Sequence, residues 1–266
     1  MKNILVLIHA DSCQEARLQC ALDIVRATGG HLNCLDVTSP PMLADDFVGN
    51  YGQSVVIQEA IEREQANRVR LEPRLVAEGL PYTWEDAIGV IGERIVDSSA
   101  LNDLVVVSLK GPKPDPIGGD IAEQIVSRVG RPVLAVPGGV RSIDLFGPAM
   151  IAWDGSDAAE AAMRAAQPLL RFASEVELVT VGDHGGLRTS ENAAAHCDRH
   201  GIKLEVVNLP KGDVKTHEAL LARAKFSGAG WMVMGAYGHS HFRENIFGGT
   251  TRDMLRHSPI PLFLAH

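Results

Sequence analysis

Short apolar runs alternate with longer segments of mixed polarity along the whole chain. The runs have the length of buried strands, about four to eight residues, and the segments between them show the spacing of amphipathic helices. In the first half this pattern predicts strands at residues 3–8, 31–37, 81–84, 103–109 and 132–136, separated by helices at 13–24, 57–78, 89–100 and 119–129. In the second half it predicts strands at 149–153, 175–181, 203–209, 231–234 and 261–264, separated by helices at 158–169, 189–200, 213–226 and 249–257.

The two halves therefore repeat one order of elements, and residues 137–142, with the sequence PGGVRS, are typical of a linker between them. Strands that are apolar throughout, joined by helices, indicate parallel sheets covered by helices on both faces. The sequence predicts an α/β fold of two tandem, doubly wound, Rossmann-like domains at residues 1–140 and 146–266.

Composition restricts the class of partner. The chain has 266 residues, 45% of them hydrophobic, and a net charge of −8, which argues against a broad nucleic-acid or anionic-membrane surface. The apolar start of the chain is interrupted by His9 and Asp11, well short of a signal peptide or membrane span. The four cysteines form no CxxC pair and are typical of buried thiols in a reducing compartment. We expect a cytoplasmic protein without membrane or nucleic-acid partners.

The most distinctive motif follows the strand at residues 231–234. Gly235 and Gly238 are followed, after nine residues, by Gly248, Gly249 and the pair Thr250–Thr251. Glycines allow the backbone to approach a ligand closely, and a helix that begins near Gly249 directs free N–H groups toward an anion. The spacing differs from that of a P-loop, which has a lysine after its second glycine. A phosphate-binding loop is the functional interpretation, and a glycine-rich turn that binds nothing is the structural alternative.

A second turn, Asp154–Gly155–Ser156, follows the first strand of the same half. Ligands of doubly wound sheets bind at the carboxyl ends of strands where the strand order reverses, so the turn at Asp154 and the loop that begins at Gly235 are expected to face each other. An aspartate there can accept hydrogen bonds from a base amino group or a sugar hydroxyl. Ser156 fits the N-cap of the following helix at least as well as a ligand contact.

Together, the Asp154 turn and the glycine motif resemble the universal stress protein family, which has an aspartate at its first strand tip and a glycine motif of this spacing that ends in serine or threonine. Here Gly249 precedes the threonine, so either Gly248–Gly249 or Gly249–Thr250 takes the family's last position. The resemblance covers both halves and implies a tandem member that binds ATP, or ADP or AMP, with Mg²⁺. The expected nucleotide-binding residues are Asp154, Gly155, Val181, Gly235, Gly238, His239, Gly248, Gly249, Thr250 and Thr251. The resemblance also implies that the final strands of the two halves meet in an intramolecular pseudo-dimer, with a homodimer as a further state.

The first half lacks the same features. His9 aligns with Asp154, and Ser108 begins the segment that replaces the glycine loop. Pro112, Pro114 and Pro116 remove donors from this segment, and Asp120 places negative charge where a phosphate would bind. The sequence predicts one competent nucleotide site, in the second half, and a long surface loop at residues 38–54.

No catalytic set is evident. The sequence contains no Gly-x-Ser-x-Gly elbow, and the pair His239 and His241 lacks further metal ligands nearby. Arg252 is the arginine best placed to contact phosphate. The main hypothesis is thus a nucleotide-binding stress-response or regulatory protein without a dedicated enzymatic activity. Its alternatives are a slow ATPase or nucleotide hydrolase at the same site, and an interaction scaffold that binds no nucleotide.

Overall fold

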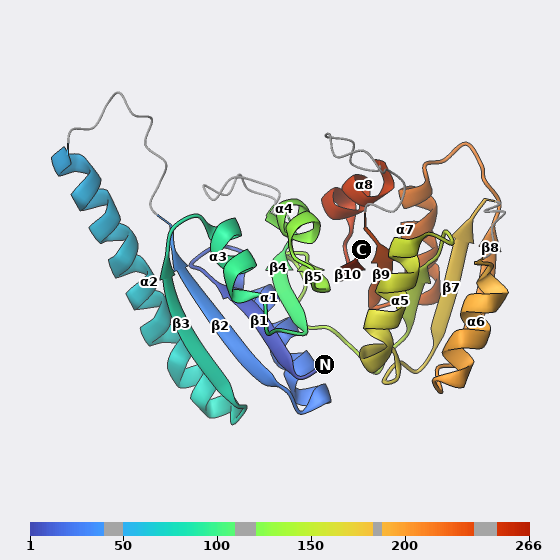
Figure 1. The fold of residues 1–266 in the computed structure, drawn as a ribbon, viewed down its shortest axis with the longest axis horizontal. Helices are drawn as coiled ribbons and strands as arrows, with labels where there is room; N and C mark the ends of the chain where they lie inside the picture. The colour runs from blue at the N-terminus through green and yellow to red at the C-terminus, as the bar shows by residue number, and fades with distance from the viewer. Residues whose placement is uncertain (40–49, 110–120, 183–187, 237–248) are drawn as a thin grey trace.

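The computed structural model describes residues 1–39, 50–109, 121–182, 188–236 and 249–266, with side chains of the helix that begins at Asn50 described from residue 57 onward. Within these residues the strands form one ten-stranded sheet in the order β3-β2-β1-β4-β5-β10-β9-β6-β7-β8. Figure 1 shows the two halves side by side, with β5 and β10 between them. The sheet is parallel within each half, which confirms the predicted doubly wound α/β fold.

The described elements follow the predicted order. The first half contains β1 (Asn3–Ile8), α1 (Gln14–Thr28), β2 (His31–Thr38), α2 (Asn50–Glu78), β3 (Tyr82–Ile88), α3 (Ile91–Ser98), β4 (Leu104–Ser108), α4 (Ile121–Arg128) and β5 (Val133–Val136). The second half contains β6 (Ala149–Ala152), α5 (Asp157–Leu170), β7 (Val176–Val181), α6 (Ser190–Arg199), β8 (Glu205–Leu209), α7 (Thr216–Ser227), β9 (Trp231–Gly235), α8 (Gly249–His257) and β10 (Leu262–Ala265).

The two halves join through their final strands. β5 and β10 pair antiparallel, with Leu134 opposite Phe263 and Val133 opposite Leu264. All four side chains are buried. The two five-stranded sheets therefore become one continuous sheet whose inner edges cover each other, which removes two unpaired strand edges from solvent.

Helices cover both faces of this sheet because its strands are apolar on both sides. One buried cluster joins alternate strand residues, such as Ile4 and Val233, to α1, α2, α5 and α6. The other joins the intervening residues, such as Leu5 and Met232, to α3, α4, α7 and α8. Strand alternation thus assigns each side chain to one of two helix layers.

Two expected boundaries differ from the structure. Residues 50–54, which we expected in the loop at 38–54, belong to α2, which begins at Asn50; residues 40–49 lie outside the described part. β3 extends to Ile88 rather than ending at residue 84, because its pairing with β2 continues as far as Thr38 opposite Ile88. Backbone pairing to a buried strand compensates for the low strand propensity of Glu85 and Asp86.

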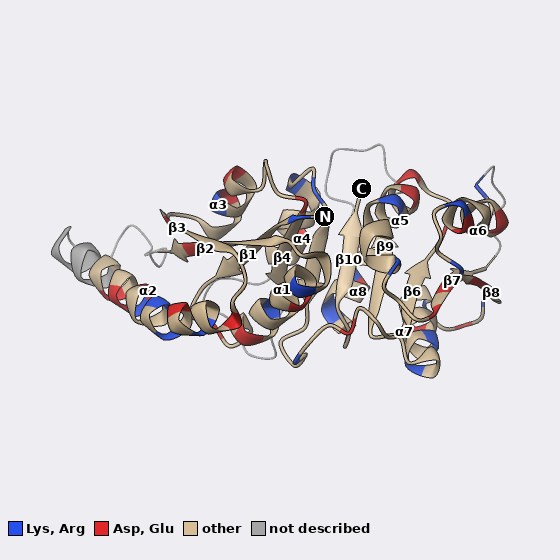
Figure 2. Cartoon of the chain, turned by 90° about the horizontal axis from the view of Figure 1, so that it is seen from below, with Lys and Arg blue, Asp and Glu red and all other residues tan. Residues whose placement is uncertain are grey.

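α2 is the longest helix described, with 29 residues. Figure 2 shows acidic and basic residues interspersed along the described part of this helix. Arg68 pairs with Asp86 of β3 at 2.8 Å, and Arg74 pairs with Glu15 of α1 at 2.6 Å. The outer layer of the first half is thus held by mixed charges on this helix and does not form a basic surface.

Candidate functional site at the carboxyl ends of the strands

The strand order of the second half reverses between β6 and β9. β6 is its first strand and β9 its fourth, and the two are hydrogen-bonded neighbours, with Ala152 opposite Met234. The chain leaves β6 toward Asp154 and leaves β9 at Gly235. The structure therefore brings the starts of the two predicted turns to neighbouring strand ends, where ligands of doubly wound sheets bind.

The turn after β6 is tightly built. Asp154 Oδ1 accepts a hydrogen bond from the backbone N–H of Ser156 at 3.0 Å, and Ser156 Oγ accepts one from Ala159 N–H at 3.1 Å. Ser156 is thus the N-cap of α5, which is the capping role that the sequence offered as an alternative to a ligand contact. Gly155 has φ of 73°, and a Cβ there would lie 3.0 Å from the Arg188 carbonyl oxygen, so both backbone and space favour glycine.

Gly235 has a packing role that the sequence alone did not reveal. A Cβ on this residue would lie 2.5 Å from the backbone nitrogen of Ala159 and 2.7 Å from the carbonyl carbon of Ala158. The start of α5 therefore packs directly on the end of β9, and only glycine allows that approach. This contact fixes the N-terminal end of α5 beside the loop that follows β9.

The remaining predicted residues are only partly described. Gly249 begins α8, Thr250 is half-buried and Thr251 is buried in its first turn. Val181 ends β7 and is buried. Gly238, His239 and Gly248 lie outside the described residues, as does the whole nine-residue interval between the glycines, which includes His241.

Arg252, which we expected to contact phosphate, lies toward the other half of the molecule. Its Nε is 3.4 Å from Oε1 of Glu123, a buried acidic residue of α4. Asp253, the next residue, lies 3.3 Å from Nδ1 of His217 on α7. α8 is therefore positioned by polar contacts with α4 and α7, and Arg252 contributes to the association of the halves.

Strand register identifies equivalent positions in the two halves. Ile4 is opposite Leu104 at the start of β4, and Ala149 is opposite Trp231 at the start of β9, so Ile4 and Ala149 are equivalent. Counting five residues onward makes His9 the counterpart of Asp154, as the sequence alignment proposed. The pairings of Ile4 with Leu32 and of Ala149 with Val176 likewise make Val37 the counterpart of Val181.

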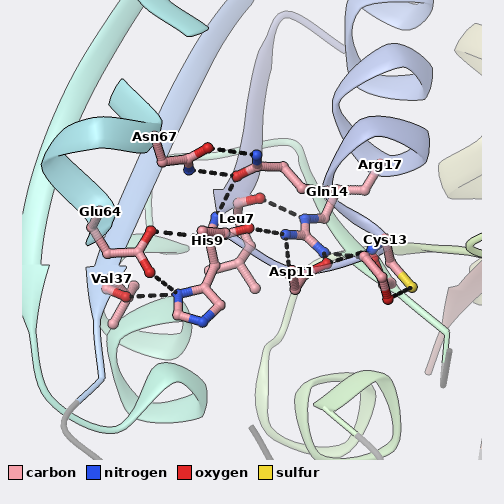
Figure 3. Close-up of polar contacts among 12 residues, drawn as sticks. Leu7, His9, Asp11, Cys13, Gln14, Arg17, Val37, Glu64 and Asn67 are labelled. Atoms are coloured by element: carbon pink, nitrogen blue, oxygen red, sulfur yellow. Dashed lines mark hydrogen bonds and ion pairs between the residues drawn. The ribbon is translucent and has the colours of Figure 1, made fainter. Parts of the chain in front are cut away.

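The side chain of His9 contacts the neighbouring strand end instead of leaving it open. Its Nδ1 lies 3.1 Å from the carbonyl oxygen of Val37 and 3.0 Å from Oε1 of Glu64, which α2 supplies (Figure 3). His9 and Glu64 are both 3% exposed. An imidazole held by a carboxylate therefore occupies the polar position where the second half has Asp154.

In the first half, the Arg17 side chain links the ends of the neighbouring strands β1 and β4. Its side chain is 1% exposed and donates from Nε to the Leu7 carbonyl oxygen at 2.6 Å and from Nη1 to Ser108 Oγ at 2.6 Å. Its Nη2 pairs with Asp11 Oδ2 at 2.6 Å, as Figure 3 also shows. Ser108 is equivalent to Gly235 by register, so a guanidinium bridges the switch point of the first half, whereas close helix packing occupies this place in the second.

Sequence reasoning missed the polar cluster around His9. Gln14 of α1 and Asn67 of α2 exchange two side-chain hydrogen bonds of 2.8 Å, and Gln14 also accepts one from the His9 backbone N–H. Asp36 on β2 is 4% exposed, and burial, with the nearby carboxylate of Glu64 as the next cause, raises its pKa to about 7. The signal available in the sequence was a lone acidic residue within the strand at residues 31–37.

Among the described residues, no group of three or more histidine, cysteine or acidic side chains is arranged to hold a metal ion. In the same part of the chain, no helix is long and apolar enough to cross a membrane.

No protein-family model matches the chain. It is 26% identical over 175 residues to a universal stress protein of Synechocystis sp., a match that covers 60% of this chain. That match spans 56% of the relative, so it leaves close to half of the relative's length unmatched.

Two solved structures resemble the whole fold. A universal stress protein from Archaeoglobus fulgidus superposes with a TM-score of 0.77 at 19% identity, covering 99% of this chain and 97% of its own. A functionally unknown protein of Pseudomonas aeruginosa superposes with a TM-score of 0.60 at 15% identity, covering 99% of this chain and 92% of its own. The tandem arrangement of the two halves is therefore shared over nearly the full length of these structures.

Proposed function

We propose that this chain, which resembles the universal stress protein family in sequence and has that family's fold in two tandem copies, binds one adenine nucleotide in its C-terminal half. The observation that carries the proposal is the juxtaposition of β6 and β9. It sets the Asp154 turn beside the first glycine of the phosphate-type motif. In this arrangement Asp154 and Val181 contact the base and ribose, and the glycine motif with the start of α8 contacts the phosphates.

The first half supports the restriction to one site. Its equivalent space holds the Arg17 guanidinium and the His9 imidazole, both of them buried and hydrogen-bonded to the protein itself. A ligand entering there would have to break these contacts and leave the Asp11 carboxylate without the Arg17 guanidinium, which is costly in a buried position. We propose residues 1–140 as a degenerate domain and residues 146–266 as the nucleotide-binding domain.

Binding, rather than turnover, is the proposed activity. Binding of ATP, ADP or AMP, with Mg²⁺, would change the surface that the C-terminal half offers to a regulatory partner or to a second copy of the chain. Asp253, a carboxylate near the motif, is engaged by His217 and has no catalytic partner in the described residues. Hydrolysis at this site is therefore expected to be slow. We also propose that the protein acts in the cytoplasm.

The test is mass spectrometry of nucleotide released from the purified protein, followed by calorimetric titration with ATP, ADP and AMP. Gly238→Val should abolish phosphate binding, and Asp154→Ala should weaken base or ribose recognition by about tenfold or more, as expected for a charge-assisted hydrogen bond. Failure of the wild-type protein to bind any of the three nucleotides would leave the scaffold alternative.

Matched controls exist in the linker between the halves. Gly139→Val is the control for Gly238→Val, because a Cβ on Gly139 would meet no atom within 4 Å. Asp144→Ala is the control for Asp154→Ala, because Asp144 also accepts a backbone N–H from the residue two positions later, at 3.0 Å. If the controls and the site variants lose affinity equally, the site has been misplaced.

A further inference from the structure

The seam between the first two helices differs between the halves. In the first half, α1 and α2 are joined across their seam by the Gln14–Asn67 pair and by contacts of Arg74 with Glu15 and Gln19 at 2.6 and 2.8 Å. In the second half, the equivalent helices α5 and α6 enclose a cavity of about 200 Å³. α6 has 10 residues where α2 has 29, so it supplies fewer side chains to fill the seam.

The floor of this cavity is apolar. Trp153, Met163 and Ala193 line it, and each of them is buried. Trp153 is fixed by a hydrogen bond of 3.3 Å from its indole N–H to the Arg188 carbonyl oxygen. A flat apolar group can therefore lie against an indole and a thioether whose positions are already set by the fold.

The rim of the cavity carries more positive than negative charge. Arg164 and Arg188 both line it, and both pair at 3.0 Å with the same carboxylate, that of Glu160, one with each oxygen. Arg188 also contacts Asp157, which lies at the surface outside the lining of the cavity. A guanidinium has five N–H donors, so the contacts with Glu160 and Asp157 leave donors on both arginines for a further anion.

The opposite wall is neutral and polar. His196 lines the cavity and lies 2.9 Å, ring nitrogen to amide nitrogen, from Gln167 of α5. Burial, followed by the charges of His200 and Arg164, lowers the pKa of His196, which keeps this imidazole uncharged at neutral pH. The positive charge of the site is thus concentrated at the two arginines.

We propose that the cavity between α5 and α6 binds a small planar carboxylate, with the ring against Trp153 and Met163 and the carboxylate between Arg164 and Arg188. Cavity, apolar floor and paired guanidiniums are all needed for this assignment. An inorganic anion would leave the floor empty, and a neutral ring would leave the arginines unused. The cavity adjoins the Asp154 turn, since Trp153 precedes Asp154 and the Arg188 carbonyl oxygen lies beside Gly155, but its lining contains none of the proposed nucleotide-binding residues.

The test uses three probe molecules that divide the ligand into its parts. Benzoate has both ring and charge, benzamide keeps the shape without the charge, and acetate keeps the charge without the ring. Binding is followed on the full chain by heteronuclear NMR and by the fluorescence of Trp153, with Trp153→Phe identifying the signal. We expect benzoate to bind at least about tenfold more tightly than either of the others, the ratio of one charge-assisted contact.

Variants then locate the binding. Arg164→Gln should weaken benzoate about tenfold while leaving benzamide unchanged. Ala193→Leu should fill the floor and abolish binding of the ring. Arg171→Gln, at an exposed arginine just after α5, is the matched control and should bind as the wild type does.

Four results would overturn the proposal. These are equal affinity for benzoate and benzamide, tighter binding of inorganic phosphate than of benzoate, unchanged binding by a folded Ala193→Leu protein, and loss of benzoate when ATP saturates the chain. The last of these would place the ligand in the nucleotide site. Absence of ATP binding with retained benzoate binding would refute the proposed function alone.

Discussion

Replacement of Asp36 by asparagine tests the energetic reasoning about the first half most directly. Asp36 lies on β2 and faces Glu64 of α2, Asp86 of β3, His9 after β1 and Arg68 of α2. Its Oδ1 is buried and has no hydrogen-bond partner among the described residues. Burial, aided by the two neighbouring carboxylates, raises its pKa from 3.8 to about 7, with His9 and Arg68 opposing the shift. Asparagine keeps the size of the side chain and removes its charge.

The direction in which stability changes with pH follows from the protons bound by the folded and the unfolded protein. Between pH 3.8 and about 7 the folded protein keeps the Asp36 proton while the unfolded chain releases it. Folding therefore binds a proton in this interval, and the free energy of unfolding falls as pH rises until the folded carboxyl is ionised. The stabilisation is present at low pH and is lost as pH rises through about 7. Between pH 5 and the folded-state pKa of about 7, an interval of about two pH units, the free energy of unfolding falls by about 3 kcal/mol.

The assay is urea unfolding of the wild type and of Asp36→Asn at pH 5 and pH 8. The stability of the variant relative to the wild type should increase by about 3 kcal/mol from pH 5 to pH 8, because other titrating groups are common to both proteins. Asp198→Asn, at an exposed position on α6, is the control and should follow the wild type at both pH values. Parallel pH profiles for the wild type and Asp36→Asn would refute a buried, proton-binding carboxyl at this position.

Three further predictions concern the fold. Gly235→Ala should destabilise the second half by roughly 3 kcal/mol or more, measured by urea unfolding, because its Cβ would lie 2.5 Å from the Ala159 nitrogen. Phe263→Ala should cost about 3–5 kcal/mol in the same assay, since this fully buried ring lies where β5 and β10 meet; a cost below 1 kcal/mol would mean that the junction is not packed as described. Arg17→Met should cost about 3–5 kcal/mol in the same assay, because it leaves the buried Asp11 carboxylate without its guanidinium; a cost below roughly 1 kcal/mol would mean that this ion pair is not buried as described.

The local pattern of apolar and polar residues was sufficient to predict most of the architecture. Apolar runs and amphipathic spacing predicted, in order, the ten strands and eight helices that the described residues form, because the inner parallel strands are buried on both faces and therefore read as largely apolar. One of the boundaries that differed, the end of β3, is set by a neighbouring strand. β3 continues to Ile88 because β2 pairs with it, and the sequence of β3 taken alone contains polar residues at 85 and 86.

The candidate site was likewise predicted only in part from the sequence. Glycine spacing and the Asp154 turn indicated where a ligand would bind in the second half, and the absence of both in the first half was evident from alignment. The contacts that fill the first half join residues far apart in sequence, such as His9 with Glu64 and Arg17 with Ser108. Such pairs leave no periodic signal, so the sequence predicted a lost site but not the side chains that occupy it.

The sequence by itself therefore determined the repeat, the order of elements and the positions of the two turns, because these follow from hydrophobic periodicity and backbone chemistry within short stretches of chain. Tertiary structure alone decided that Gly235 is required by the packing of α5, that Arg252 pairs with Glu123 and that Asp36 binds its proton up to about pH 7. The physical reason is that close approach, ion pairing and desolvation depend on which groups surround an atom in space. Those groups come from both halves and from elements that the sequence keeps apart.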